Sequence, residues 1–183
     1  MAYIFECYHC GIGLKAQADQ AGDVMKCPDC GGSVNVPHAF IEPGTVIGGF
    51  RIQKLIGSGG MADVFVAEQL AMGREVALKV IDPLLARDSE TAENFIREMQ
   101  MTARLEHPNI VTVYDAGESE GYLFLAMSKV QGEDVDQLLR REGALPERKA
   151  IRIGLSVANA LDYAWSTGEI LHRDIKPANI MVD

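Results

Sequence analysis

Four cysteines near the N-terminus are the residues best arranged to bind a metal ion. They form two pairs, Cys7 with Cys10 and Cys27 with Cys30, each separated by two residues. Such spacing lets one tight turn direct both sulfurs at a single ion, and the sixteen residues between the pairs allow the second turn to return opposite the first. The pattern predicts a four-cysteine zinc ribbon with a structural or partner-binding role, because no coordination position is left for water.

The same cysteines admit other chemistry. Two disulfides or free thiols are the less favoured alternative. His9 could replace one thiolate as a ligand, but with four thiolates present we expect it to be a loop residue. Because the N-terminus lacks the basic start and the long apolar core of a signal peptide, we expect a cytoplasmic, reducing location, which favours zinc over disulfides. A segment this short buries little apolar surface, so the metal is expected to supply most of its folding free energy.

A glycine-rich turn is the second candidate site. The segment from Ile56 to Val64 reads Ile-Gly-Ser-Gly-Gly-Met-Ala-Asp-Val. Gly57, Gly59 and Gly60 have no side chains, so their backbone N–H groups can approach phosphate oxygens closely. Glycine-rich hairpins are common, however, and this turn alone does not identify a nucleotide site.

The residues that follow the turn make the pattern more specific. A Val-Ala-Leu-Lys run that ends at Lys79 follows on a predicted strand, and Glu98 follows on a predicted helix. This order resembles the nucleotide-binding part of the protein kinase signature. The resemblance implies that Lys79 contacts the α- and β-phosphates of ATP and forms an ion pair with Glu98. The third glycine of the family pattern is Ala62 here.

The same resemblance implies where the adenine of ATP would lie. Val64 and Ala77 would contact the ring, Met127 would close the back of its pocket, and the backbone from Ser128 to Val130 would form hydrogen bonds with it. A buried methionine in an apolar strand would look similar without a ligand. The residues that the resemblance assigns to ATP binding are Ile56, Gly57, Ser58, Gly59, Gly60, Val64, Ala77, Lys79, Glu98 and Met127.

The run from Leu171 to Ile180 carries groups that phosphoryl transfer requires. It reads Leu-His-Arg-Asp-Ile-Lys-Pro-Ala-Asn-Ile and resembles the catalytic loop of protein kinases. By that resemblance Asp174 orients the acceptor hydroxyl and accepts its proton, Lys176 steadies the γ-phosphate, and Asn179 binds Mg²⁺. A lysine two positions after the aspartate, followed by proline, is similar to Ser/Thr rather than Tyr kinases.

The sequence ends at Asp183, before any Asp-Phe-Gly motif, which in the family supplies the main Mg²⁺ ligand. The resemblance covers about residues 44 to 183, roughly the first half of a kinase domain. We therefore expect a fragment of a longer Ser/Thr protein kinase that uses ATP to phosphorylate protein hydroxyls. The alternative is a non-catalytic module in which the ribbon and the half-kinase bind a nucleotide or a protein partner.

Hydrophobic patterns predict the elements that position these residues. Strands are expected over residues 50–56, 64–69, 75–81, 110–116 and 122–127. Helices are expected over residues 89–105 and 134–141 and from Pro146 onward. The buried stripe of the last helix is expected to consist of Ile153, Val157, Ala160, Leu161 and Ala164. Without the rest of a C-lobe, that stripe is expected to lie exposed and to make the chain prone to aggregation.

The fold class that these expectations give is α+β. A kinase-like N-lobe, with an antiparallel sheet and one helix, leads into the start of a helical C-lobe and follows the small zinc ribbon. The expected division is a ribbon over 1–36, a linker and lead-in over 37–49, and a partial kinase domain over 50–183. The expected cofactors are ATP, Mg²⁺ and structural Zn²⁺.

Charge and hydropathy restrict the partners. The net charge of −9 comes from 26 acidic and 17 basic residues, which argues against nucleic acid as the main partner. The sequence contains no apolar run of membrane-spanning length. The expected partners are proteins with Ser or Thr as substrates and a protein that binds the ribbon.

Overall fold

The computed structural model describes residues 2–37, 41–59, 62–81, 93, 96–97, 99 and 103–183. The chain forms two compact units. The first contains Met1–Met99 and Val113–Met127, and the second contains Gln100–Thr112 and Ser128–Asp183. No helix in the described ranges combines the length and the apolar character that crossing a membrane requires.

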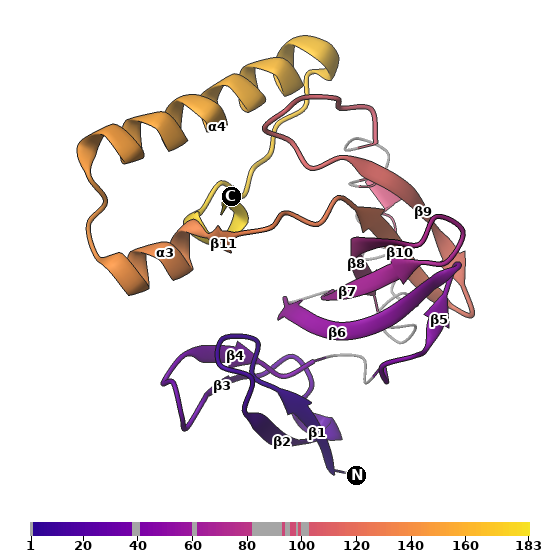
Figure 1. The fold of residues 1–183 in the computed structure, drawn as a ribbon. Helices are drawn as coiled ribbons and strands as arrows, with labels where there is room; N and C mark the ends of the chain where they lie inside the picture. Colours follow the sequence, from indigo (N-terminus) through magenta and orange to yellow (C-terminus); the bar gives the residue numbers. More distant parts are fainter. Residues whose placement is uncertain are drawn as a thin grey trace. The chain divides into compact units, whose positions relative to one another are not determined.

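The N-terminal ribbon, residues 2–37, consists of two short antiparallel hairpins (Figure 1). In the first, β1 (Ala2–Glu6) pairs with β2 (Gly13–Gln17). In the second, β3 (Val24–Lys26) pairs with β4 (Ser33–Asn35), and a 3-10 turn, η1 (Ala18–Gln20), lies between the hairpins. Each cysteine pair lies in the turn that joins the two strands of one hairpin.

The interior of the ribbon is small. Gly11 and Gly31, which follow the two cysteine pairs, have φ angles of 80° and 70°, a left-handed conformation that glycine adopts without strain. The residues that form the buried cluster are Phe5, Cys7, Leu14, Ala16, Cys27, Val34 and Val36. Two of its members are therefore cysteines of the candidate metal site.

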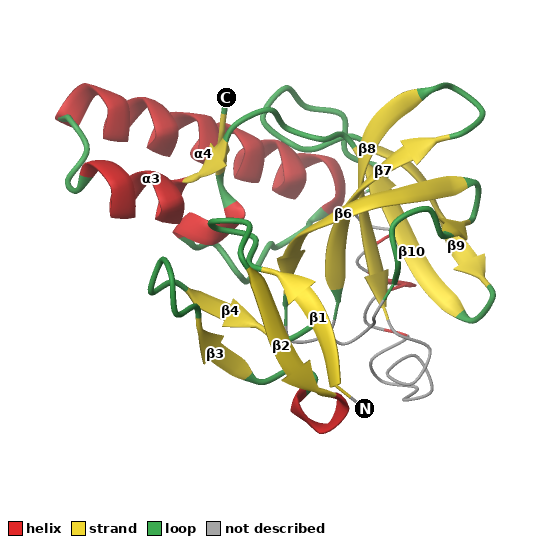
Figure 2. Ribbon diagram, turned by 60° about the horizontal axis from the view of Figure 1, so that its bottom comes forward, coloured by secondary structure: helices red, strands yellow, loops and turns green. Residues whose placement is uncertain are grey.

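Beyond the ribbon, the first unit contains a six-stranded antiparallel sheet (Figure 2). Its strand order is β5-β6-β7-β8-β10-β9. The strands are β5 (Val46–Ile47), β6 (Phe50–Ser58), β7 (Asp63–Gln69), β8 (Arg74–Ile81), β9 (Val113–Ser119) and β10 (Tyr122–Met127). The sequence predicted all of these except β5. The predicted start of β9, residue 110, is too early, because the Ile110 N–H donates to the His107 carbonyl in a turn and the strand begins at Val113.

The two faces of the sheet carry different clusters. One face packs Phe65, Leu78 and Phe124 into the larger apolar core, together with residues of β5 and β6. The other face packs Ile81 and Leu125 with Ala62 and Met99. Met99 belongs to the helix predicted over residues 89–105, of which most residues lie outside the described ranges; residues 93, 96–97 and 99 are helical.

The second unit contains two helices. α3 (Val135–Glu142) begins where the Asp134 carboxylate accepts a hydrogen bond from the Gln137 N–H, and it ends at Gly143 with φ 75°. α4 (Glu147–Gly168) begins directly after Pro146 and ends at Glu169 in the left-handed conformation. Both helices begin close to the predicted positions, because Asp134 and Pro146 mark their first turns, and Gly143 marks the end of α3.

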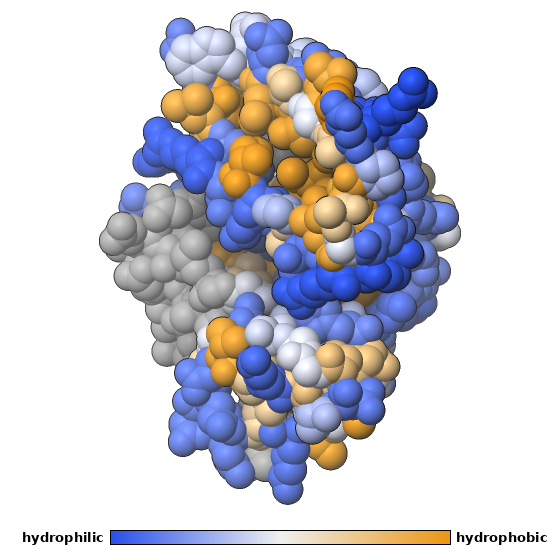
Figure 3. Space-filling view, turned by 90° about the vertical axis from the view of Figure 1, so that its left-hand side faces the viewer, coloured by the Kyte–Doolittle hydropathy of each residue, from blue (hydrophilic) through white to orange (hydrophobic). Residues whose placement is uncertain are grey.

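The α4 helix carries two apolar stripes rather than one. In the predicted stripe Ala160 and Ala164 are buried, and the other three residues are half-buried. A second stripe of Ile151, Leu155 and Trp165 is 51–60% exposed and lies within an arc of about 80° on the opposite side of the helix. The stripe that is most exposed is therefore not the stripe that was predicted to be exposed. Figure 3 shows apolar side chains at the surface of the helical unit.

Candidate functional site

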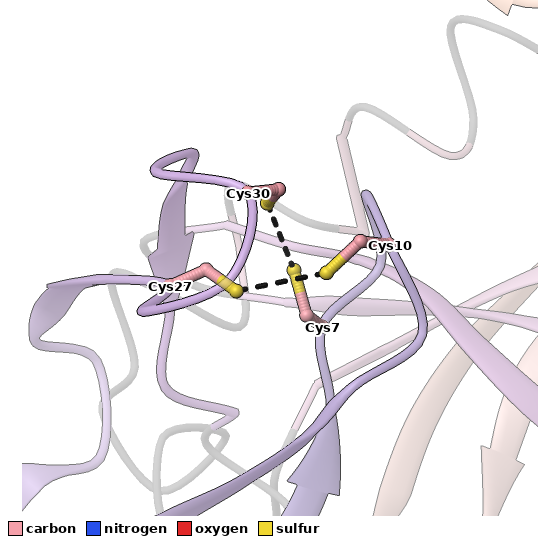
Figure 4. A group of neighbouring side chains, drawn as sticks. All are labelled: Cys7, Cys10, Cys27 and Cys30. Atoms are coloured by element: carbon pink, nitrogen blue, oxygen red, sulfur yellow. Dashed lines mark hydrogen bonds between the residues drawn. The ribbon is translucent and has the colours of Figure 1, made fainter.

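The four cysteine sulfurs gather in one cluster (Figure 4). All four lie within 4.8 Å of one another, with 3.8 Å between Cys7 and Cys30 and 3.6 Å between Cys10 and Cys27. Sulfurs at the corners of a zinc tetrahedron, with Zn–S bonds of about 2.3 Å, would be about 3.8 Å apart. A disulfide requires about 2.05 Å, and all four cysteines are free. The arrangement therefore fits a shared metal ion better than two disulfides.

The surroundings act differently on the thiols of the cluster. Backbone N–H groups lower the pKa values of Cys10 and Cys30, but burial and the neighbouring thiols outweigh them, raising the pKa of Cys10 to about 12 and raising that of Cys30 as well. The Cys30 N–H, followed by that of Asp29, lowers the pKa of the Cys27 thiol to about 7. A thiol with this pKa is substantially ionised at neutral pH, and the thiolate is the form that binds a metal. His9, the alternative ligand, instead places Nε2 3.0 Å from the Ser33 carbonyl oxygen. His9 therefore holds strand β4, and the four cysteines form the cluster.

The glycine-rich turn connects β6 and β7. Gly57 pairs with Val64, and the Gly59 N–H donates to the Ala62 carbonyl, which keeps the turn narrow. The Ser58 hydroxyl donates to the Asp63 carboxylate at 2.5 Å. Gly60 lies outside the described residues.

Asp63 is a residue that sequence reasoning missed. Its side chain is 1% exposed, and within the described ranges it is the one buried acidic residue. The sequence feature that could have revealed Asp63 is a charged residue at the start of an apolar strand. The neighbouring Ala62 is also buried, because its methyl group packs with Ile81 and Met99, so the alanine at the third glycine position has a packing role.

The strand register brings four predicted ATP-binding residues to one face of the sheet. Val64 lies opposite Lys79, and Ala77 lies opposite Met127. Because residues two apart on a strand point to the same side, all four side chains share that face. Met99 packs on the same face. Glu98, the predicted ion-pair partner of Lys79, lies outside the described residues.

The segment after β10 is the predicted adenine hinge. The Ser128 N–H donates to the Thr112 carbonyl at 2.8 Å, and the Ser128 hydroxyl accepts from the Thr112 N–H at 3.0 Å. The N–H of Ser128 is thus engaged within the protein. This N–H would therefore not serve as the donor to adenine, and a backbone N–H later in the predicted hinge, such as that of Val130, would have to supply it.

The predicted catalytic loop forms a compact set of contacts around Asp174. Its carboxylate lies 2.9 Å from Lys176 Nζ and accepts a hydrogen bond of 2.9 Å from Asn179 Nδ2. The same Asn179 nitrogen donates to the Asp174 carbonyl at 2.8 Å. Lys176, and then Asn179, lower the pKa of Asp174, which therefore remains a carboxylate at neutral pH. All three predicted catalytic residues are thus brought together.

The backbone around this loop is fixed by pairings distant in sequence. β11 (Glu133–Asp134) pairs with β12 (Met181–Val182), and the Val135 N–H donates to the Ile180 carbonyl. The 3-10 turn η2 (Pro177–Asn179) places Asn179 close to Asp174. Arg173 has φ 60°, a left-handed conformation that is rare for a residue with a side chain.

Gly132 is a second residue that sequence reasoning missed. A Cβ atom there would lie 1.9 Å from the Val182 carbonyl oxygen, so only glycine fits beside the end of the loop. The only signal in the sequence was an isolated glycine before an acidic pair.

Comparison with known proteins identifies related chains. Residues 50–183 match the protein kinase domain family. The Ser/Thr-protein kinase pkn3 of Myxococcus xanthus is 45% identical over 135 residues, which are 73% of this chain and 24% of that protein. The Ser/Thr-protein kinase PknJ of Mycobacterium tuberculosis is 42% identical over 142 residues, 78% of this chain and 24% of that protein. The chain spans about a quarter of the length of these relatives.

A solved structure shows the same fold. The crystal structure of the Mycobacterium tuberculosis PknI kinase domain superposes with a TM-score of 0.68 at 38% sequence identity. The match covers 78% of this chain and 57% of that one. The expected fold class is confirmed: a kinase N-lobe sheet with the first helices of a C-lobe. The N-terminal ribbon precedes the residues that match the family.

Proposed function

This chain belongs to the protein kinase family, and we propose that it contributes the ATP-binding sheet and the catalytic loop of an enzyme that phosphorylates Ser or Thr residues of proteins. The contacts of Asp174 with Lys176 and Asn179 carry this proposal. They hold a carboxylate, a cation and an amide in one loop, which are the groups needed to orient a hydroxyl and to hold a phosphate and a metal ion.

Asp174 acts mainly by orientation. A carboxylate with a lowered pKa is a weak base, so it accepts a hydrogen bond from the substrate hydroxyl and takes the proton only as the phosphoryl group transfers. Lys176 adds positive charge beside the position of the γ-phosphate. Because Asn179 uses its amide nitrogen on Asp174, its amide oxygen is the atom that would hold Mg²⁺. When bound, that ion neutralises phosphate charge.

The sheet binds ATP through one face and one turn. Val64, Ala77 and Met127 would contact the adenine ring, and Lys79 would contact the α- and β-phosphates. The glycine-rich turn from Ile56 to Gly60 would place backbone N–H groups on the phosphates. Glu98 would hold Lys79 in place, as the family pattern implies.

The N-terminal ribbon is proposed to bind one structural Zn²⁺ through Cys7, Cys10, Cys27 and Cys30. The distances between the sulfurs and the lowered pKa of Cys27 support this proposal. Chelation should release one zinc per chain, measured with a metal-sensitive dye, and the ribbon should then become susceptible to protease. We place the protein in the cytoplasm, where ATP is available and thiols stay reduced.

Phosphoryl transfer by the natural gene product tests the kinase proposal. The product and its Asp174→Asn variant are incubated with radiolabelled ATP and a generic basic protein substrate. We expect labelled phosphoserine or phosphothreonine from the unchanged protein and at least a hundredfold less from the variant. ATP binding that depends on Lys79, without transfer in either protein, would instead support a non-catalytic nucleotide-binding module.

A further inference from the structure

A hydrogen bond joins the N-terminal ribbon to the glycine-rich turn. The Asn35 side-chain amide, at the end of β4, donates to the carbonyl oxygen of Ser58 at 2.5 Å. Ser58 is the last residue of β6 and the first to enter the turn, and its hydroxyl already binds Asp63 on the other strand. Asn35 therefore holds the turn at the point where its two strands part.

The position of Asn35 depends on the cysteine turns. Tyr8, between Cys7 and Cys10, accepts a hydrogen bond from the Asn35 N–H at 3.2 Å through its hydroxyl. His9, in the same turn, contacts the Ser33 carbonyl at the other end of β4. A continuous set of contacts thus runs from the candidate metal site through Tyr8 and Asn35 to Ser58.

The connection between the ribbon and the sheet is short. Val36 is part of the ribbon core, and Ile41 is part of the sheet core. Five peptide bonds separate these two buried residues, so their Cα atoms lie at most about 18 Å apart. Such a tether keeps the ribbon near the sheet at a high effective concentration, which lowers the entropic cost of forming the hydrogen bond between Asn35 and Ser58.

We propose that the metal-bound ribbon holds Ser58, at the base of the glycine-rich turn, through the hydrogen bond from Asn35, and that loss of the metal releases Ser58 and weakens nucleotide binding. The inference rests on the proposed zinc and ATP sites. A strand end that is already held in place loses less conformational entropy when phosphates bind beside it. Without zinc the ribbon lacks most of its folding free energy, and Tyr8 no longer positions Asn35.

Hydrogen–deuterium exchange on the unchanged chain without nucleotide tests the link directly. We expect a chelator to accelerate exchange in the peptide from Ile56 to Val64 by roughly two- to tenfold, the factor that one net hydrogen bond provides. Asn35→Ala, which keeps all four cysteines, should show the same acceleration with zinc bound, and adding the chelator should change this peptide no further. Tyr8→Phe should give a smaller acceleration.

Controls separate this link from general unfolding and from the kinase proposal. Lys15→Ala, at an exposed position of β2, should exchange like the unchanged chain. Titration with a fluorescent ATP analogue should show roughly two- to tenfold weaker binding for Asn35→Ala. Unchanged exchange in the turn after both chelation and Asn35→Ala would overturn the inference. If exchange changes as expected but the chain binds no nucleotide, the proposed ATP-binding role and the predicted loss of ATP affinity would both be wrong. The link between the ribbon and Ser58 would still hold.

Discussion

The N-terminal ribbon and the six-stranded sheet are both antiparallel β structures, but their interiors differ in size and in composition. No strand of the ribbon exceeds five residues, and two of its seven core residues are cysteines. The sheet has strands of up to nine residues and an apolar cluster on each face. If the proposed zinc is bound, the difference predicts that the short hairpin pair depends on a metal where the larger sheet uses apolar burial.

Cys27→Ser should have the largest effect on this comparison. It removes a buried member of the cysteine cluster, so the ribbon should lose the proposed zinc and its fold while the sheet stays folded. Zinc content and limited proteolysis followed by mass spectrometry measure both effects, with cleavage expected within residues 2–37. A ribbon that resists protease without zinc would show that its apolar core is sufficient.

Leu78→Ala should destabilise the sheet and leave the ribbon intact. Leu78 is fully buried in the larger cluster, so its truncation should lower the free energy of unfolding by about 2–5 kcal/mol. Urea denaturation followed by circular dichroism measures the loss, and zinc content reports on the ribbon. Loss of zinc from the folded variant would contradict the separation of the two cores.

Gly48→Ala should have a smaller effect that depends on one contact. A Cβ atom at Gly48 would lie 2.3 Å from the Phe124 ring, whereas one at Gly49 would meet nothing within 4 Å. Both glycines have positive φ, so Gly49→Ala is a matched control for backbone strain. We expect Gly48→Ala to be less stable than Gly49→Ala by about 1–3 kcal/mol in the same denaturation assay. Equal stability would mean that Phe124 moves aside freely.

Local signals made much of the fold predictable. Asp134 and Gly143 define the ends of α3, and Pro146 defines the start of α4, because capping depends on neighbouring residues alone. The two-residue strand β5 was missed, since so short a run has no readable periodicity. The exposed stripe on α4 was also missed, because sequence alone does not show which apolar side of a helix finds a partner.

In the candidate sites too, contacts between residues close in sequence were predictable and contacts between distant residues were not. The contacts among Asp174, Lys176 and Asn179 span six residues, so a motif was enough to group them. The close approach of Gly132 to Val182 and the bond from Asn35 to Ser58 join residues distant in sequence. Such contacts follow from tertiary structure, which no local pattern encodes.

The contacts of Asn179 explain why an amide occupies this position. A carboxylate would bind a divalent cation more strongly on charge alone. It would also place a second negative charge 2.9 Å from the Asp174 oxygen, where the amide nitrogen now donates a hydrogen bond. Repulsion between two such carboxylates would raise the pKa of Asp174, and the hydrogen bond that now orients its carboxylate would be lost. The neutral amide of Asn179 would thus bind a metal ion less strongly than a carboxylate would, but it keeps the pKa of Asp174 low.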